Sequence, residues 1–285
     1  MEFKFKHWLF FYCLIAIIAI FLYLDYTKIN SKYFQINYLD IGQGDSILII
    51  TPENQKILID TGLIGNLNKK FKKYISFFDK EIDLFMLTHP DSDHIGDVLN
   101  ILKNYQIKQI VLPKSIQQNA EFKILLNNIK SEKIPFLFAN SETDLKIGKN
   151  VFIDFLYPFK NTSTKEQNIF NNSSLVFKVV YKENSFLFSG DAEAKQEKMI
   201  LQSIQNLKAD IYQAGHHGSK TSSSEIFLQA IQPKITIISA EKDNSFGHPH
   251  KDVIKSLKNK GSIIYQTAEE GDITFYSDGN IYWKK

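Results

Sequence analysis

Six of the seven histidines in this chain of 285 residues lie at the ends of expected β-strands, where they come in pairs. Histidines that only pack in a core would not be distributed in this way, and imidazole is the commonest metal ligand in proteins. The chain therefore has to fold so that strand ends far apart in the sequence meet at one site. The pairs are His89 with His94, His216 with His217, and His248 with His250.

The densest segment, residues 89–94, reads His-Pro-Asp-Ser-Asp-His and stands between an expected strand and an expected helix. In an extended chain His89 and Asp91 point to one side. Asp93 and His94 lie where the chain turns into the helix, and they reach a second position. This arrangement supports two divalent ions that share a nucleophilic water. The alternative is that the aspartates cap the helix at Ile95 and the histidines are incidental.

Short β-rich runs and amphipathic helices alternate from residue 33 onward. Strands first and then helices, in two matching halves, predict two packed sheets with helices outside. The polar stretch 160–174 is too short for a domain linker, so residues 33–285 are expected to form one domain. Strands are expected at 33–40, 46–51, 56–60, 82–87, 107–112, 134–138, 151–157, 175–181, 186–189, 210–213, 235–239, 273–276 and 280–283. Helices are expected at 67–78, 95–104, 120–132, 193–205, 223–231 and 251–260.

Residues 8–24 form a run of 17 residues without a charge. Spanning a hydrocarbon core of about 30 Å takes roughly 20 residues, with a lower limit near 17. No small-residue cleavage site follows, so we expect an uncleaved transmembrane signal-anchor at 8–24, between a short flank at 1–7 and a linker at 25–32. The alternatives are a cleaved signal peptide, which would make the protein secreted, and a buried core helix.

The charges that flank this run bear on its orientation. Lys4 and Lys6 precede the run, and Lys28 and Lys32 follow it, so the count is nearly balanced. Short positively charged N-termini usually stay in the cytoplasm. We therefore expect a membrane-anchored protein whose catalytic domain lies outside the cytoplasm.

All 34 basic residues are lysines, and the net charge is only +3. The charge gives no general argument for a polyanionic partner, and a phosphate has to be held by lysines, backbone amides or metals because arginine forks are absent. The single cysteine, Cys13, excludes an intramolecular disulfide and a cysteine-based zinc site. Lysines on the helices 67–78 and 251–260 form solvated faces in the simpler interpretation, and contact nucleic acid in the alternative.

The motifs together resemble the metallo-β-lactamase superfamily, and within it the hydrolase domain of ComEC-type competence proteins. The resemblance covers residues 33–283 and implies an αββα four-layer sandwich with metal-dependent hydrolase activity. ComEC-type proteins also carry a multi-span channel and usually an OB-like domain. This sequence shows neither, so we expect only the hydrolase part of the resemblance to apply. The matching segments are 39–46, 60–62, 88–96, 189–191, 216–219 and 247–250.

Two departures from the superfamily pattern stand out. Asp91 replaces the second histidine of HxHxDH, as in the ComEC-like branch, and no histidine lies between His94 and His216 to serve the third motif. Asn172 and Ser173 occupy that region instead. The cofactor expected is a pair of divalent ions, Zn²⁺ or Mn²⁺, because oxygen-rich sites suit Mn²⁺ better than purely imidazole sites do.

The resemblance implies a role for each candidate residue. His216 is favoured over His217 as a ligand because Gly-His at a strand end is the recurring form. Asp93 is expected to act in catalysis, with proton transfer to the leaving oxygen by His248 or His217. The expected metal ligands are His89, Asp91, Asp93, His94, Asp191 and His216. Asp60, Asp45 and Gln43 are expected to support the site, and Lys220, Thr221, Ser222, Asn172 and Ser173 to bind substrate.

Three aspartates and two divalent ions leave a site with about one positive charge before hydroxide binds, which suits a phosphate better than a neutral amide. We therefore expect a phosphodiesterase or nuclease that acts on nucleic acid. One alternative is a cell-surface hydrolase of another ester or phosphoester, such as phosphorylcholine. Another is a non-catalytic binding module with a vestigial metal site. The sequence indicates no protein partner.

Overall fold

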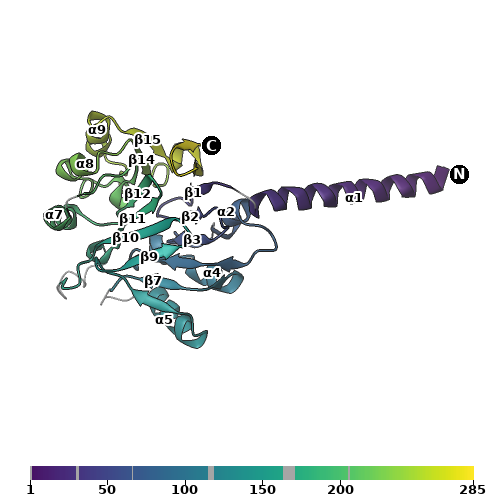
Figure 1. Cartoon of the computed structure of the whole chain (residues 1–285), viewed down its shortest axis with the longest axis horizontal. Coiled ribbons are helices and arrows are strands. Elements are labelled where there is room, and N and C mark those ends of the chain that lie inside the picture. Colours follow the sequence, from purple (N-terminus) through teal and green to yellow (C-terminus); the bar gives the residue numbers. More distant parts are fainter. Residues whose placement is uncertain (1, 30–31, 66, 115–118, 163–170, 205) are drawn as a thin grey trace.

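Two β-sheets lie face to face, and helices cover the outer face of each sheet (Figure 1). The computed structural model describes residues 2–29, 32–65, 67–114, 119–162, 171–204 and 206–285. Most of the expected polar stretch 160–174 and part of the expected linker 25–32 lie outside the described residues, as do the side chains of Lys4, Lys6 and Lys28.

The first sheet has eight strands in the described part of the chain, in the order β17-β16-β1-β2-β3-β5-β7-β8. Strands β3, β5, β7 and β8 run parallel, so their carboxyl ends meet at one edge. The C-terminal hairpin joins this sheet because β16 pairs antiparallel with β1. The strands are β1 (Phe34–Tyr38), β2 (Ile47–Ile50), β3 (Lys56–Ile59), β5 (Leu84–Met86), β7 (Ile110–Leu112), β8 (Phe136–Phe138), β16 (Ile273–Ser277) and β17 (Tyr282–Lys284).

The second sheet has seven strands in the described residues, in the order β15-β14-β13-β12-β11-β10-β9. Here β12, β13, β14 and β15 run parallel, and β9 to β12 are antiparallel neighbours. The strands are β9 (Asp144–Ile147), β10 (Val151–Tyr157), β11 (Val176–Tyr181), β12 (Asn184–Phe188), β13 (Ile211–Gln213), β14 (Ile235–Ile238) and β15 (Ile263–Gln266). A separate pair, β4 (Glu81–Ile82) and β6 (Gln106–Ile107), lies outside both sheets.

The side chains of alternate strand residues build two different cores, because successive residues of a strand point to opposite faces. On β12, Phe186 and Phe188 enter the core between the sheets, whereas Leu187 faces the helices. Phe177 on β11 stacks on Phe188 with ring centroids 5.0 Å apart. This alternation positions the strand ends that carry the histidines.

The outer faces of the sheets are closed by helices with apolar stripes. Phe71 on α2 and Ile101 on α4 pack on the first sheet, and Leu228 on α8 packs on the second. The expected αββα sandwich is therefore confirmed. The first sheet carries α2 (Leu67–Tyr74), α4 (Val98–Asn104) and α5 (Ala120–Ser131), and the second carries α7 (Ala194–Ser203), α8 (Glu225–Ile231) and α9 (Lys251–Asn259).

Several elements differ from the expected ones. The single helix expected at 95–104 is two helices, α3 (Ser92–Ile95) and α4, which are separated at Gly96 and Asp97. Strands β9 and β15 were not expected, and their outward residues are polar or exposed. The helix expected at 67–78 ends at Tyr74, because Ser76 and Phe77 bond to another segment.

That other segment is the N-terminal helix α1 (Glu2–Ile29), which projects away from the two sheets (Figure 1). Its stretch His7–Tyr26 is long and apolar enough to cross a membrane, and every side chain in it except that of Asp25 is exposed. A buried core helix is therefore excluded for this stretch. The boundaries 1–7, 8–24, 25–32 and 33–285 stay predictions.

Removing a ring from the core between the sheets should destabilise the whole fold. Phe177 is fully buried, and Phe177→Ala is expected to lower the free energy of unfolding by about 3–5 kcal/mol. Phe152 lies on the neighbouring strand β10 and is 47% exposed, so Phe152→Ala should cost less than about 1 kcal/mol. Urea unfolding measures both values. Equal losses would contradict the two-sheet core.

Candidate metal centre

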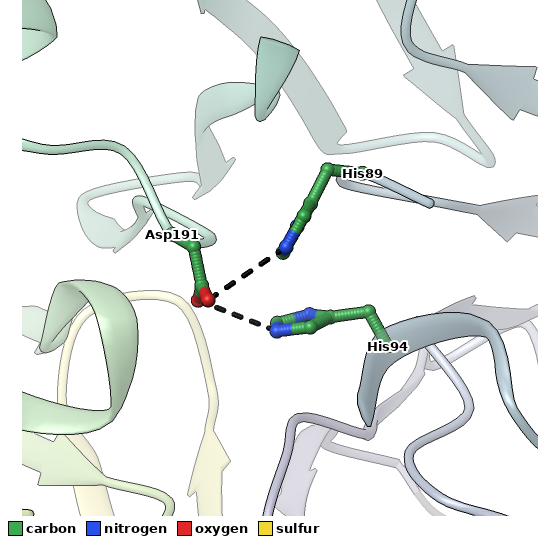
Figure 2. Close-up of side chains that lie close together, drawn as sticks. All are labelled: His89, His94 and Asp191. Carbon is green, nitrogen blue, oxygen red and sulfur yellow. Dashed lines mark ion pairs between the residues drawn. The ribbon is translucent and has the colours of Figure 1, made fainter. Parts of the chain in front are cut away.

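The site forms where the carboxyl ends of parallel strands from both sheets meet. Asp60 follows β3 and His89 follows β5 in the first sheet, whereas Asp191 follows β12 and His217 follows β13 in the second. Figure 2 shows His89 and His94 pointing at Asp191 from the opposite sheet. Ligand sites at the carboxyl ends of strands are a general property of parallel α/β sheets.

Asp191 lies at the centre, and its two oxygens face different imidazoles. Oδ1 lies 3.3 Å from Nε2 of His94 and 3.7 Å from Nε2 of His217. Oδ2 lies 3.7 Å from Nε2 of His89 and 3.6 Å from Nε2 of His216. The carboxylate therefore joins two groups of nitrogen donors.

The far nitrogen of each buried imidazole is held by the protein. Nδ1 of His94 lies 2.8 Å from Oδ2 of Asp60, and Nδ1 of His217 lies 3.0 Å from the carbonyl of Ser239. Nδ1 of His89 lies 3.1 Å from Oγ1 of Thr88. A neutral imidazole that donates from Nδ1 carries its lone pair on Nε2, which is the arrangement of metal-binding histidines. In their neutral form the three rings therefore present Nε2 to the site as an acceptor.

Four of these inward atoms are buried and have no hydrogen-bond partner: Nε2 of His89, His94 and His217, and Oδ1 of Asp191. Unsatisfied buried polar atoms are rare and costly. Two donors about 2.1 Å from one ion at a tetrahedral angle lie about 3.4 Å apart, which matches the separations around Asp191. The residues present therefore fit a divalent metal ion.

The charges of the cluster also favour a bound divalent cation. Burial raises the pKa of Asp191, but His94 and His217 outweigh burial and hold the pKa well below its usual range. Burial lowers the pKa of His94, yet Asp191 and Asp60 hold it well above its ordinary value. Without a cation, protons on imidazoles compensate the carboxylates. Metal binding has to release these protons, so the apparent metal affinity should fall as the pH is lowered.

Two further aspartates reach the cluster. Oδ2 of Asp93 lies 3.2 Å from Nε2 of His217, and Oδ1 of Asp45 lies 3.6 Å from its Nδ1. Asp93 and Asp45 each belong to a possible ligand group within the described residues. Asp91 belongs to none of these groups, and its carboxylate accepts from the amide of Ser92 at the start of α3. The ligand role of Asp91 stays a prediction.

The two adjacent histidines after β13 differ in their surroundings. His217 is buried and takes part in the possible ligand groups, whereas the side chain of His216 is 23% exposed and takes part in none that the described residues form. Both have positive φ angles, 50° and 55°. Such backbone conformations are strained and concentrate at functional sites. The geometry thus favours His217 for the position that the sequence pattern assigned to His216.

His248 lies beside this pair, at the rim of the site. Its ring centroid is 5.6 Å from that of His216 and 6.4 Å from that of His217. Its Nδ1 is buried without a hydrogen-bond partner. Burial and the neighbouring charge of His216 lower the pKa of His248 to about 4.

The candidate substrate-binding residues after His217 have different surroundings. Lys220 is exposed, and Oγ1 of Thr221 lies 3.4 Å from Nδ1 of His216. Ser222 is buried and donates to the carbonyl of Ala192, so its hydroxyl ties two loops together. The amides of Ser223 and Ser224, which lead into α8, are bonded to Glu197 at 2.5 Å and 2.9 Å. The start of α8 is therefore already occupied by a carboxylate, and these two amides are not free to bind a phosphate.

Asn172 and Ser173 lie in a short 3-10 turn, Asn171–Ser173, and both are buried. The next residue, Ser174, accepts a hydrogen bond from the amide of Asp191, so this turn borders the site. Oε1 of Gln43 accepts from the amide of Glu241 and connects two loops. The substrate-binding role of Asn172 and Ser173 stays a prediction.

Residues that bond to the candidate ligands on the side away from the site could not be identified from the sequence. Thr88 bonds to Asp60 through its amide and its hydroxyl, at 2.7 Å and 2.6 Å. Ser239 contributes only its backbone carbonyl. Because every residue type has one, the sequence gives no sign of this role. Phe246 is exposed and stacks on His248, with centroids 5.8 Å apart. A position next to the rim histidine was the only signal for Phe246 in the sequence.

Two packed mixed sheets with histidines and carboxylates at their strand ends define a class of metal-dependent hydrolases. The chain belongs to the metallo-beta-lactamase superfamily, because the model of that family matches residues 39–241. The resemblance inferred from the sequence motifs is thereby confirmed.

Relatives of this chain include ComEC-type competence proteins. ComE operon protein 3 of Bacillus subtilis is 31% identical over 276 residues, which cover 90% of this chain and 34% of that protein. Recombination protein 2 of Haemophilus influenzae is 29% identical over 268 residues, which cover 92% of this chain and 31% of that protein. The chain thus spans about a third of the length of these relatives.

Solved structures show the same fold. The metallo-beta-lactamase fold protein YhfI of Bacillus subtilis has a TM-score of 0.55 and 10% identity, covering 87% of this chain and 99% of that chain. At this identity the likeness concerns the fold alone.

Changing the central carboxylate should remove the metal without removing the fold. Asp191→Asn is expected to abolish binding of Mn²⁺ and Zn²⁺, because the shared carboxylate is lost. Asp60→Asn, which acts through His94, should weaken binding by about 10- to 100-fold. Asp210→Asn, at the opposite end of β13, is the control and should keep full affinity. Calorimetric titration measures the affinities, and unchanged binding by Asp191→Asn would contradict the site.

Proposed function

We propose that this protein is a membrane-anchored phosphodiesterase that cleaves nucleic acid with two divalent ions, Zn²⁺ or Mn²⁺. The observation that carries the proposal is the set of unpartnered Nε2 atoms around the buried carboxylate of Asp191. The domain occupies residues 33–285, and the segment 8–24 anchors it with the catalytic part outside the cytoplasm.

The ligands divide between the two oxygens of Asp191. His94, His217 and Asp93 serve the Oδ1 side, where all three lie within one possible ligand group. His89 serves the Oδ2 side. On that side Asp91 or His216 supplies a further ligand when the site is filled.

A divalent ion bound here supplies a hydroxide nucleophile near neutral pH and polarises the phosphoryl oxygens. Asp93 orients the attacking water through the oxygen that does not face His217. His248 stands at the rim, where burial lowers its pKa to about 4, and it donates a proton to the leaving oxygen once the negative charge of the bound phosphate raises that pKa. His217 is unsuited to this role because its Nε2 faces Asp93 and Asp191 as a metal ligand. Lys220 and Thr221 follow the paired histidines after Gly218 and Ser219, and they contact the phosphate.

An exposed aromatic ring beside the site favours nucleic acid over a small phosphoester. Phe246 is 67% exposed, and its ring lies at 24° to that of His248. Aromatic rings next to a cleavage site hold single strands because every base has a face that stacks. Phe246 therefore gives the site a platform for the base adjoining the cleaved phosphate.

A substrate panel tests the activity. With Mn²⁺ or Zn²⁺, the protein should cleave single-stranded DNA, duplex DNA or bis-p-nitrophenyl phosphate, and Asp191→Ala should reduce turnover to the level without metal. The Asp210→Asn variant is the folded control. Turnover of only a phosphorylcholine ester, a lactam or a thioester would contradict the proposed activity on nucleic acid. Less than one equivalent of metal after loading would favour a non-catalytic module.

A second variant tests the base platform. Phe246→Ala should lower kcat/KM for single-stranded DNA by roughly 5- to 100-fold, since stacking contributes about 1–3 kcal/mol per base. Cleavage of an oligonucleotide that is abasic beside the cleaved phosphate should not change, because no base is there to stack. Phe152→Ala, far from the histidines in sequence, is the control. Equal losses on both substrates would show that Phe246 supports the site rather than the base.

A further inference from the structure

The loop that follows α2 carries two adjacent aromatic rings on the surface. Phe77 is 58% exposed and Phe78 is 67% exposed. A helix was expected to continue to Phe78, but α2 ends at Tyr74 and the chain then turns outward. Two neighbouring phenylalanines left in water are costly unless something covers them.

This loop is attached to α1 by a charged clamp. Asp25, near the C-terminal end of α1, is only 5% exposed. Its carboxylate accepts from Oγ of Ser76 at 2.5 Å and from the amide of Phe77 at 2.8 Å. Charge-assisted bonds of this kind are short and about twice as strong as neutral ones.

The clamp sets the depth of the loop relative to the apolar stretch. The ring of Phe77 contacts that of Phe21, with centroids 6.2 Å apart. The stretch His7–Tyr26 has 20 residues, so it spans about 30 Å as a helix and has no length to spare across a bilayer. Phe21 lies five residues inside its end, and Phe77 therefore lies alongside a part of α1 that the membrane surrounds.

The polar groups around the rings suit the lipid headgroup region. Nζ of Lys80 lies 5.5 Å from the ring centroid of Phe77. The nearest acidic side chain in the loop, Asp79, is paired with Lys56 at 2.5 Å. A lysine beside aromatic rings is typical of segments at the surface of anionic bilayers.

We propose that Phe77 and Phe78 insert into the lipid leaflet at which α1 emerges, and that Asp25 holds them there. The hydrolase domain is then docked on the membrane in one orientation rather than hanging on a free linker. The partner of this surface is a lipid bilayer. The proposal requires that α1 enters the membrane and does not depend on the substrate of the site.

Fluorescent labels at single cysteines test this in the full chain, reconstituted in phosphatidylcholine–phosphatidylglycerol vesicles that carry a nitroxide on the lipid chain. Native Cys13, within the apolar stretch, reports insertion of α1. Phe78→Cys in a Cys13→Ser background reports the loop. Ile226→Cys in the same background is the control, because Ile226 is 57% exposed on α8, at the far side of the body from α1 (Figure 1).

The labels on Cys13 and on Phe78→Cys should lose fluorescence to the nitroxide, and the label on Ile226→Cys should not. Adding Asp25→Ala should restore fluorescence at position 78, and continued quenching would refute the clamp. Quenching at Cys13 but not at position 78 overturns the docking. A label at position 78 that is shielded from aqueous iodide yet not quenched by lipid is covered by protein, which also overturns it. An unquenched Cys13 removes the premise that α1 enters the membrane.

Discussion

The site depends on one buried carboxylate that faces imidazoles from both sheets. Asp191 lies within 3.7 Å of three buried Nε2 atoms that have no hydrogen-bond partner. Leaving such polar atoms buried and unsatisfied costs free energy unless a ligand binds there. The histidine tautomers, the bonds of Asp60 and Thr88, and the strained backbone after β13 are all arranged around this carboxylate. A divalent cation would bind the carboxylate and the unpartnered Nε2 atoms together.

The two-sheet core makes this convergence possible. Phe177, Phe186 and Phe188 join the sheets, and the carboxyl ends of β5 and β12 then meet over that core. Segments 89–94 and 189–191, far apart in the chain, become neighbours through packing alone. The candidate ligands thus lie on loops that the rigid apolar core holds in place.

Much of this could be predicted from the sequence. The order of strands and helices and the six motif segments predicted the fold class, and the histidines and aspartates at the strand ends predicted most of the donor atoms. The choice between His216 and His217 was not accessible, because it depends on a backbone turn and on the carbonyl of Ser239. The bonds of Glu197 to the start of α8, and of Asp25 to the loop after α2, could not be predicted either, since both join residues distant in sequence. Strand β9 could not be predicted because it is defined by its pairing with β10.

The central claim is that a divalent ion is held by Asp191 together with imidazole nitrogens from the opposite sheet. Anomalous diffraction from crystals of the Mn²⁺- or Zn²⁺-loaded protein tests it most directly. The account predicts a peak between Asp191 and His94, with ligand distances of about 2.0–2.2 Å to Nε2 and carboxylate oxygen. A metal peak elsewhere, with Asp191 and His94 still facing each other unligated, would contradict the account.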